Sequence, residues 1–263
     1  MRTIWTIYKR ELSQFLSSAT TYIMLAIFLA ITGFLFYNIA SYFALQCSQA
    51  VEYRMVYNVP LPPMSANRWV VLPFFSNLAI IALFLIPVLT MRSYASERNS
   101  GTAELLMTSP VKISQIVWAK LLSNFTIFMI LLSTTLIFQL ILDYYTSPGI
   151  DWGPVWSGYL GLICLAIGTI PLGQFISSLM KNQIIAAFVS FALLLLLWII
   201  DWSTLFSSGV LSSTLGYLSL SKHFTNFAKG IINTSDIIYF VSFGIFGIFL
   251  VHRSLESWRW RGI

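Results

Sequence analysis

Six long apolar runs decide which folds are open to this chain. About 18 or more consecutive apolar residues are typical of a helix that crosses a lipid bilayer. The expected spans are Tyr22–Phe43, Val70–Met91, Ile116–Leu142, Pro154–Met180, Ile184–Ile200 and Ile237–Val251. The interiors of these runs are expected to be free of charged side chains, with Lys120 at the edge of the third run. The sequence therefore predicts an all-α polytopic membrane protein with six transmembrane helices.

Composition supports the same class of protein. Of the 263 residues, 57% are hydrophobic and 9% are charged, whereas about a quarter of the residues of a soluble domain are charged. A water-soluble core does not need this much apolar surface. No polar domain is present to bind nucleic acid, so a nucleic-acid partner is excluded.

The basic residues predict how the chain is oriented. Lys and Arg are in excess on the cytoplasmic side of membrane proteins. Eleven of the fifteen fall on one predicted side: Arg2, Lys9, Arg10, Arg92, Arg98, Lys112, Lys120, Lys181, Arg253, Arg259 and Arg261. We therefore expect a multi-pass protein of the cell inner (plasma) membrane with both termini in the cytoplasm. The net charge of +6 also favours contact with anionic membrane lipid.

Residues 1–20 precede the first span and have the pattern of an amphipathic helix. Apolar residues recur at helical spacing, and Lys9, Arg10 and Gln14 lie elsewhere on the helical wheel. Such a helix is suited to lie in the membrane interface. The pattern leaves open whether it only anchors the chain or also contacts a cytoplasmic partner.

The segment 92–115 is a polar island between the second and third spans. We expect a turn at Asn99-Ser100-Gly101, then a short helix capped by Thr102 with Glu104 in its first turn. Pro110 ends this helix, and Ser114 is expected to cap the next one. From local physics the segment is either an ordinary polar loop or a surface that presses against another protein.

A resemblance favours the second interpretation. The loop resembles the signature loop of ABC-2-type permeases, the membrane subunits of one class of ATP-binding-cassette transporters. The match lies at Glu97, Arg98, Gly101, Thr102, Glu104, Leu105, Leu106, Pro110 and Val111. The segment from Tyr217 to Gly230 is also similar to a motif of one ABC-2 branch, that of the gliding-motility permease GldF and the nitrous-oxide-reductase accessory permease NosY. In that segment we expect Phe224 and Phe227 to dip into the outer interface and His223 to be a solvated interfacial residue.

The resemblance implies a partner and a role for the loop. It implies two permease chains, identical or related, with two ABC ATPase subunits on the cytoplasmic side. The loop would be a coupling helix between spans two and three, with Ala103, Leu106 and Met107 on its contacting face. The residues implied to contact the ATPase are Glu97, Arg98, Gly101, Thr102, Ala103, Glu104, Leu105, Leu106, Met107, Pro110, Lys9, Arg10 and Glu11. ATP and magnesium would bind the ATPase subunit, and no cofactor or metal is expected in this chain.

Missing motifs argue against catalysis within this chain. It has no Gly-x-x-x-x-Gly-Lys-[Ser/Thr] phosphate loop, no His-Glu-x-x-His and no Gly-x-Ser-x-Gly. Charge-free spans also argue against an ion-coupled carrier.

We therefore expect a permease subunit, an exporter driven by a separate ATPase. The alternative is the membrane module of an ATP-driven envelope assembly or motility complex, with an envelope accessory protein as partner; a channel or an intramembrane enzyme ranks third.

Domain organisation follows from these segments. We expect a single ABC-2-type transmembrane domain over 1–263, comprising an interfacial helix (1–20), a cytoplasmic coupling loop (92–115) and an outer segment (202–235).

Pro87 and Pro171 are expected to bend their helices. Small residues at Ala26, Ala30 and Gly33 form a stripe that suits close packing, within the chain or against another subunit. Cys47 and Cys164 are expected to remain unpaired.

Overall fold

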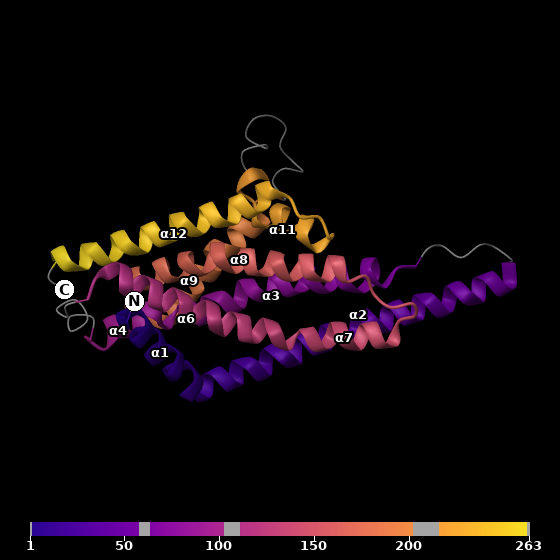
Figure 1. The fold of residues 1–263 in the computed structure, drawn as a ribbon, viewed down its shortest axis with the longest axis horizontal. Helices are drawn as coiled ribbons and strands as arrows, with labels where there is room; N and C mark the ends of the chain where they lie inside the picture. The colour runs from indigo at the N-terminus through magenta and orange to yellow at the C-terminus, as the bar shows by residue number, and fades with distance from the viewer. Residues whose placement is uncertain (1, 58–63, 103–110, 202–215, 262–263) are drawn as a thin grey trace.

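The computed structural model describes residues 2–57, 64–102, 111–201 and 216–261, and all regular secondary structure in these ranges is helical. The helices form an elongated bundle along one axis (Figure 1). Both termini lie at the same end of this bundle, close to the end of α4 (Arg92–Asn99) (Figure 1). The termini and α4 therefore share one end of the bundle, and the side of the membrane on which this end lies stays a prediction.

The first two helices differ in length from the expectation. α1 (Arg2–Ser17) covers the predicted amphipathic segment, and α2 (Ala19–Tyr57) has 39 residues. At 1.5 Å per residue α2 is about 58 Å long, roughly twice the hydrocarbon thickness of a bilayer. The first span is expected to end at Phe43, whereas the helix continues through residues 44–57. The reason is that this stretch contains no proline or glycine and is rich in good helix formers such as Ala, Leu, Gln and Glu.

The second predicted span continues beyond its apolar part. It comprises a π-helical turn η1 (Asn67–Val71), α3 (Leu72–Thr90) and α4, with a single interruption at Met91. The polar island thus begins as helix rather than loop. The expected turn follows at residues 100–102, where Gly101 has a positive φ of 72°.

The third predicted span is divided into α6 (Ile113–Thr134) and α7 (Leu136–Tyr145). The break lies at Thr135, whose buried hydroxyl lies 2.7 Å from the carbonyl of Leu132 and 3.0 Å from the hydroxyl of Tyr159. The predicted cap at Ser114 is wrong. α6 begins at Ile113, and its N-cap is Lys112.

The central helix of the bundle is α8 (Trp152–Leu179), which contacts α3, α6, α9, α11 and α12. α9 (Gln183–Ile199) returns beside it after a short turn, so the two are antiparallel neighbours. Side chains cap both helices: Asp151 Oδ1 accepts from Gly153 N at 3.0 Å, and Asn182 Oδ1 accepts from Ile184 N at 2.8 Å.

Five apolar helical stretches in the described chain are long enough to cross a membrane: Ala19–Tyr57, Asn67–Asn99, Ile113–Tyr145, Trp152–Leu179 and Thr234–Trp258. The remaining predicted span falls on α9, a shorter apolar helix of 17 residues. The protein is therefore a multi-pass membrane protein.

Two helices complete the bundle. α11 (Leu220–Ala228) is a short helix that lies against α8, α3 and α9, and α12 (Thr234–Arg261) runs back along α8 toward the end where α1 begins (Figure 1). The pair α8–α12 has the most extensive contact in the molecule. Glycines on α12 allow this approach, because a Cβ added at Gly244 would lie 2.5 Å from the carbonyl oxygen of Ile167.

Candidate functional site

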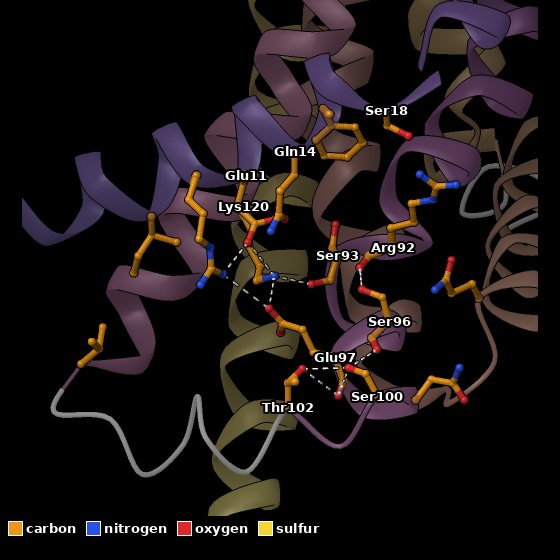
Figure 2. Close-up of a pocket in the computed structure, with 16 residues that line it drawn as sticks. Glu11, Gln14, Ser18, Arg92, Ser93, Ser96, Glu97, Ser100, Thr102 and Lys120 are labelled. Carbon is orange, nitrogen blue, oxygen red and sulfur yellow. Dashed lines mark hydrogen bonds and ion pairs between the residues drawn. The ribbon is translucent and has the colours of Figure 1, made fainter. Parts of the chain in front are cut away.

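Four charged side chains from three helices meet at the end of the bundle that carries the termini. They are Arg10 and Glu11 of α1, Glu97 of α4 and Lys120 of α6, and we call them the Lys120 cluster (Figure 2). α1 reaches this place because its apolar face packs on α6. α4 reaches it because the helix begun in α3 resumes after Met91.

Lys120 is the centre of the cluster. Its Nζ lies 2.8 Å from Glu97 Oε1, 3.3 Å from Glu11 Oε1 and 2.6 Å from the carbonyl oxygen of Ser93. An ammonium group has three N–H donors, so these acceptors satisfy all of them. The side chain is only 2% exposed, and the ring of Tyr94 lies 5.2 Å from the same nitrogen. Cation–π contact with that ring adds to the stabilisation of the charge.

The charges of the cluster balance. Glu11 and Glu97 are 11% and 15% exposed, so each carboxylate is largely removed from water. Arg10 is about half exposed and contacts Glu11 at 2.9 Å and Glu97 at 3.9 Å. Two cations thus face two anions. Buried charges are tolerated when they are paired and hydrogen-bonded in this way.

The junction between α3 and α4 is held by a serine of the central helix. Ser177 Oγ accepts from the backbone N–H groups of Tyr94 and Ala95, both at 3.1 Å, and donates to the carbonyl of Met91 at 2.9 Å. In an uninterrupted helix the N–H of Tyr94 would donate to the carbonyl of Thr90. The hydroxyl therefore gives the N–H of Tyr94 the acceptor that the interruption removes.

α6 and α8 make further polar contacts to α4. Asn124 Nδ2 of α6 donates to Ser93 Oγ at 2.7 Å. Arg98 Nη1 donates to the carbonyls of Leu179 (2.8 Å) and Ser178 (3.4 Å) at the C-terminal end of α8. A cation at this position satisfies the last carbonyls and complements the helix dipole.

An open cleft of about 920 Å³ lies beside the cluster, between α1 and α4. Figure 2 shows that Gln14 of α1 and Ser18, which follows α1, line it on one side, and that Arg92, Ser96 and Ser100 line it from the α4 segment. Its walls therefore combine charged and polar side chains with apolar surface from residues such as Ile7, Phe15 and Val111. Such a surface suits a protein partner better than an apolar ligand.

The structure places the residues predicted to contact the ATPase in two groups. Lys9, Arg10, Gly101 and Thr102 are exposed, whereas Glu11, Glu97 and Arg98 make contacts within the chain. The remaining predicted residues lie outside the described part of the chain: Ala103, Glu104, Leu105, Leu106, Met107 and Pro110. Pro87 and Pro171 lie inside the helices α3 and α8.

A second polar cluster lies at the base of α11 and corrects the expectation for this segment. His223 is 6% exposed, with Nδ1 2.5 Å from Asp236 Oδ1 and Nε2 3.0 Å from the carbonyl oxygen of Tyr217. Phe224 and Phe227 are 1% and 0% exposed. The expectations of a solvated histidine and of interfacial phenylalanines are therefore wrong, because α11 presents the face that carries all three side chains to the protein.

Sequence reasoning missed the tertiary role of several polar residues in apolar helices. The sequence predicts only that Lys120 lies at the edge of a span, and it makes no prediction for Ser177. For Lys120 a signal existed: with Asn124 it places two strongly polar side chains one helical turn apart, on one face of an apolar helix. For Ser177 the sequence gives no signal, because serine is common in membrane helices and its partners lie more than 80 residues away.

The geometry defines a class of protein. It is a polytopic helical membrane protein whose buried polar contacts tie an amphipathic N-terminal helix to the helix that precedes the polar loop. In the part of the chain that the structure describes, no group of three His, Cys, Asp or Glu side chains is placed to hold a metal ion.

Residues 48–235, more than two thirds of the chain, match the family described as ABC-2 family transporter protein. The chain belongs to this family and is the membrane component of an ABC transporter. No curated protein matches it. Members of this family work with a separate ABC ATPase, which supplies the catalytic activity.

Proposed function

We propose that the chain is the permease subunit of an exporter in the cell inner membrane, with both termini in the cytoplasm. A second copy or a homologue would complete the permease, and ATP and magnesium would bind the separate ATPase subunits. The ATPase would dock where α1, α4 and the segment 103–110 meet. Closure of the ATPase pair would then move the spans and release substrate outward.

The location of α4 is the observation that carries this proposal. α4 leads directly into the segment that resembles a coupling helix. Polar contacts attach it to α6 and α8 and, through the half-exposed Arg10, to α1. A segment that receives force from a partner has to be attached firmly to the spans, since otherwise only the loop would move. The open cleft between α1 and α4 gives the partner charged, polar and apolar side chains to contact.

A second candidate is the membrane module of an ATP-driven assembly or motility complex. The segment from Tyr217 to Gly230 favours it, because this segment resembles the branch of GldF and NosY and is buried through His223, Phe224 and Phe227. In this alternative the complex acts on an envelope accessory protein and moves no solute. ATP-dependent uptake into inverted membrane vesicles would favour the exporter, and ATP hydrolysis without such uptake would favour the assembly module.

Co-purification tests the partner. An affinity tag on this chain should isolate an ABC ATPase from its own cells, and the double variant Glu104→Lys/Leu106→Arg should lose it. The control is Lys222→Gln, which changes an exposed charge on α11, distant from α4. If the double variant still retains an active ATPase, the segment 103–110 is not the docking element.

A further inference from the structure

Ser177 connects the α3–α4 junction to the central helix more firmly than its small size suggests. A hydroxyl can donate one hydrogen bond and accept two, and Ser177 Oγ makes all three, each to the backbone of the junction. The residue is 0% exposed, so no water competes for these bonds. One side chain of α8 thus holds both sides of the interruption at Met91.

Neighbouring contacts attach the same junction to α8. A Cβ added at Gly173 would overlap the hydroxyl of Thr90, so the last turn of α3 lies directly on α8. At the other end of α4, Arg98 donates to the carbonyl of Leu179. α4 and the last turn of α3 are therefore held against the C-terminal part of α8 from Gly173 to Leu179.

The helical connection between the body of α3 and this unit is weakened at Pro87. Pro87 has no N–H and cannot donate to the carbonyl of Leu83, which removes one hydrogen bond just before the last turn. A helix bends most readily where such a bond is absent. The weak point therefore lies within α3 and precedes the part that is pinned to α8.

We infer that Ser177 is a positioning residue that makes α4 and the C-terminal part of α8 move as one unit, while α3 follows by bending at Pro87. This inference rests on the proposed function, because it concerns where the force of the ATPase enters the bundle. The force enters α8, the most buried of the long helices, and spreads from there to α12. The link to α12 includes the hydrogen bond of 2.7 Å between Ser178 Oγ and Ser254 Oγ.

Distances between spin labels test the inference in the complete complex. In a background of Cys47→Ser and Cys164→Ser, one label is placed at Asn99→Cys with a second at Leu179→Cys or at Ile80→Cys, all at exposed positions. Labelled chain is diluted with unlabelled chain so that only distances within one chain are read. On trapping with ATP and vanadate, the 99–179 distance should stay constant and the 99–80 distance should change by several ångströms.

Ser177→Ala should reverse the first result, so that the 99–179 distance changes on trapping while the ATPase still co-purifies. The matched control is Thr169→Val, which removes another buried hydroxyl of α8 that bonds only within its own helix. A 99–179 distance that changes in the unaltered chain, or a 99–80 distance that stays constant, would overturn the inference.

Hydrogen exchange provides a readout that needs no partner. Ser177→Ala should speed exchange of the Tyr94 amide by roughly tenfold, because Tyr94 is the third residue of α4, has no helical acceptor and loses Ser177, and Thr169→Val should leave this rate unchanged. An unchanged rate in Ser177→Ala overturns the inference even if no ATPase is found. Loss of the ATPase from the unaltered chain contradicts the proposed function instead, so the two failures are distinguishable.

Discussion

At the scale of single residues, Lys120 shows how a charge is kept inside an apolar bundle. Its helix is hydrophobic, and the lysine is stable there because α1 and α4 each bring a carboxylate to it. Neither helix supplies both anions. The ion pairs therefore depend on the tertiary arrangement, and they report whether α1 and α4 are in place.

Lys120→Met should lower the free energy of unfolding by about 3 kcal/mol, since it leaves two largely buried carboxylates without their main partner. Thermal unfolding of the purified protein in detergent measures this. The triple variant Lys120→Met/Glu11→Gln/Glu97→Gln removes the charges together and should recover part of the loss. If the single and triple variants are equally stable, the ion pairs contribute little.

Asp236, in the first turn of α12, also holds two helices together, because its partners lie on α11. Its two oxygens accept from Asn226 Nδ2 at 2.8 Å and contact His223 Nδ1. Asp236→Ala should cost about 2 kcal/mol, because buried polar groups of both partners lose hydrogen bonds. Lys222→Ala, an exposed change on the same helix, should have little effect in the same unfolding experiment.

At the scale of helices, small residues decide which pairs pack closely. The stripe predicted on α2 is not buried within this chain. Ala26 and Ala30 are exposed, and a Cβ added at Gly33 would lie 3.5 Å from the ring of Phe138. A closer approach to the backbone of another helix lies instead between α8 and α12. There Gly244 faces the carbonyl of Ile167, the carbonyl that Pro171 leaves without its helical N–H donor.

Gly244→Ala should therefore destabilise the protein by about 1–3 kcal/mol, because the added methyl group would meet backbone that cannot move aside. Gly33→Ala is the matched control. Its added methyl group meets only ordinary van der Waals contact, and alanine favours helix over glycine by up to about 1 kcal/mol. Equal loss of stability in both variants, measured by thermal unfolding, would contradict the close approach of α8 and α12.

At the scale of the whole molecule, the arrangement of the helices predicts which surfaces face each side of the membrane. The termini and α4 share one end of the bundle (Figure 1), and the excess of basic residues predicts that this end is cytoplasmic. The position of Lys229 after α11 and before α12 predicts that it lies on the other side.

Cysteine labelling in intact cells checks this orientation. In a Cys47→Ser background, an impermeant maleimide should label Lys229→Cys from outside and should label Ser100→Cys only after the cells are opened. Both positions are exposed, so accessibility within the protein is matched. Labelling of Ser100→Cys in intact cells would invert the topology and exclude docking of a cytoplasmic ATPase at this end.

The sequence by itself determined the class of protein, because a long apolar run has few stable conformations other than a membrane helix. The short connection between the expected spans Pro154–Met180 and Ile184–Ile200 also determined that α8 and α9 are antiparallel neighbours, since three connecting residues leave no other arrangement. Helix ends were harder to predict. α2 continues to Tyr57 and α4 begins at Arg92, beyond the apolar runs, because residues that are too polar for a span can still favour a helix. Only the tertiary structure decided the burial of His223, the three partners of Ser177 and the acceptors of Lys120. Each of these depends on groups outside the residue's own helix, and a polar side chain in a membrane protein finds its partner only when the helices pack.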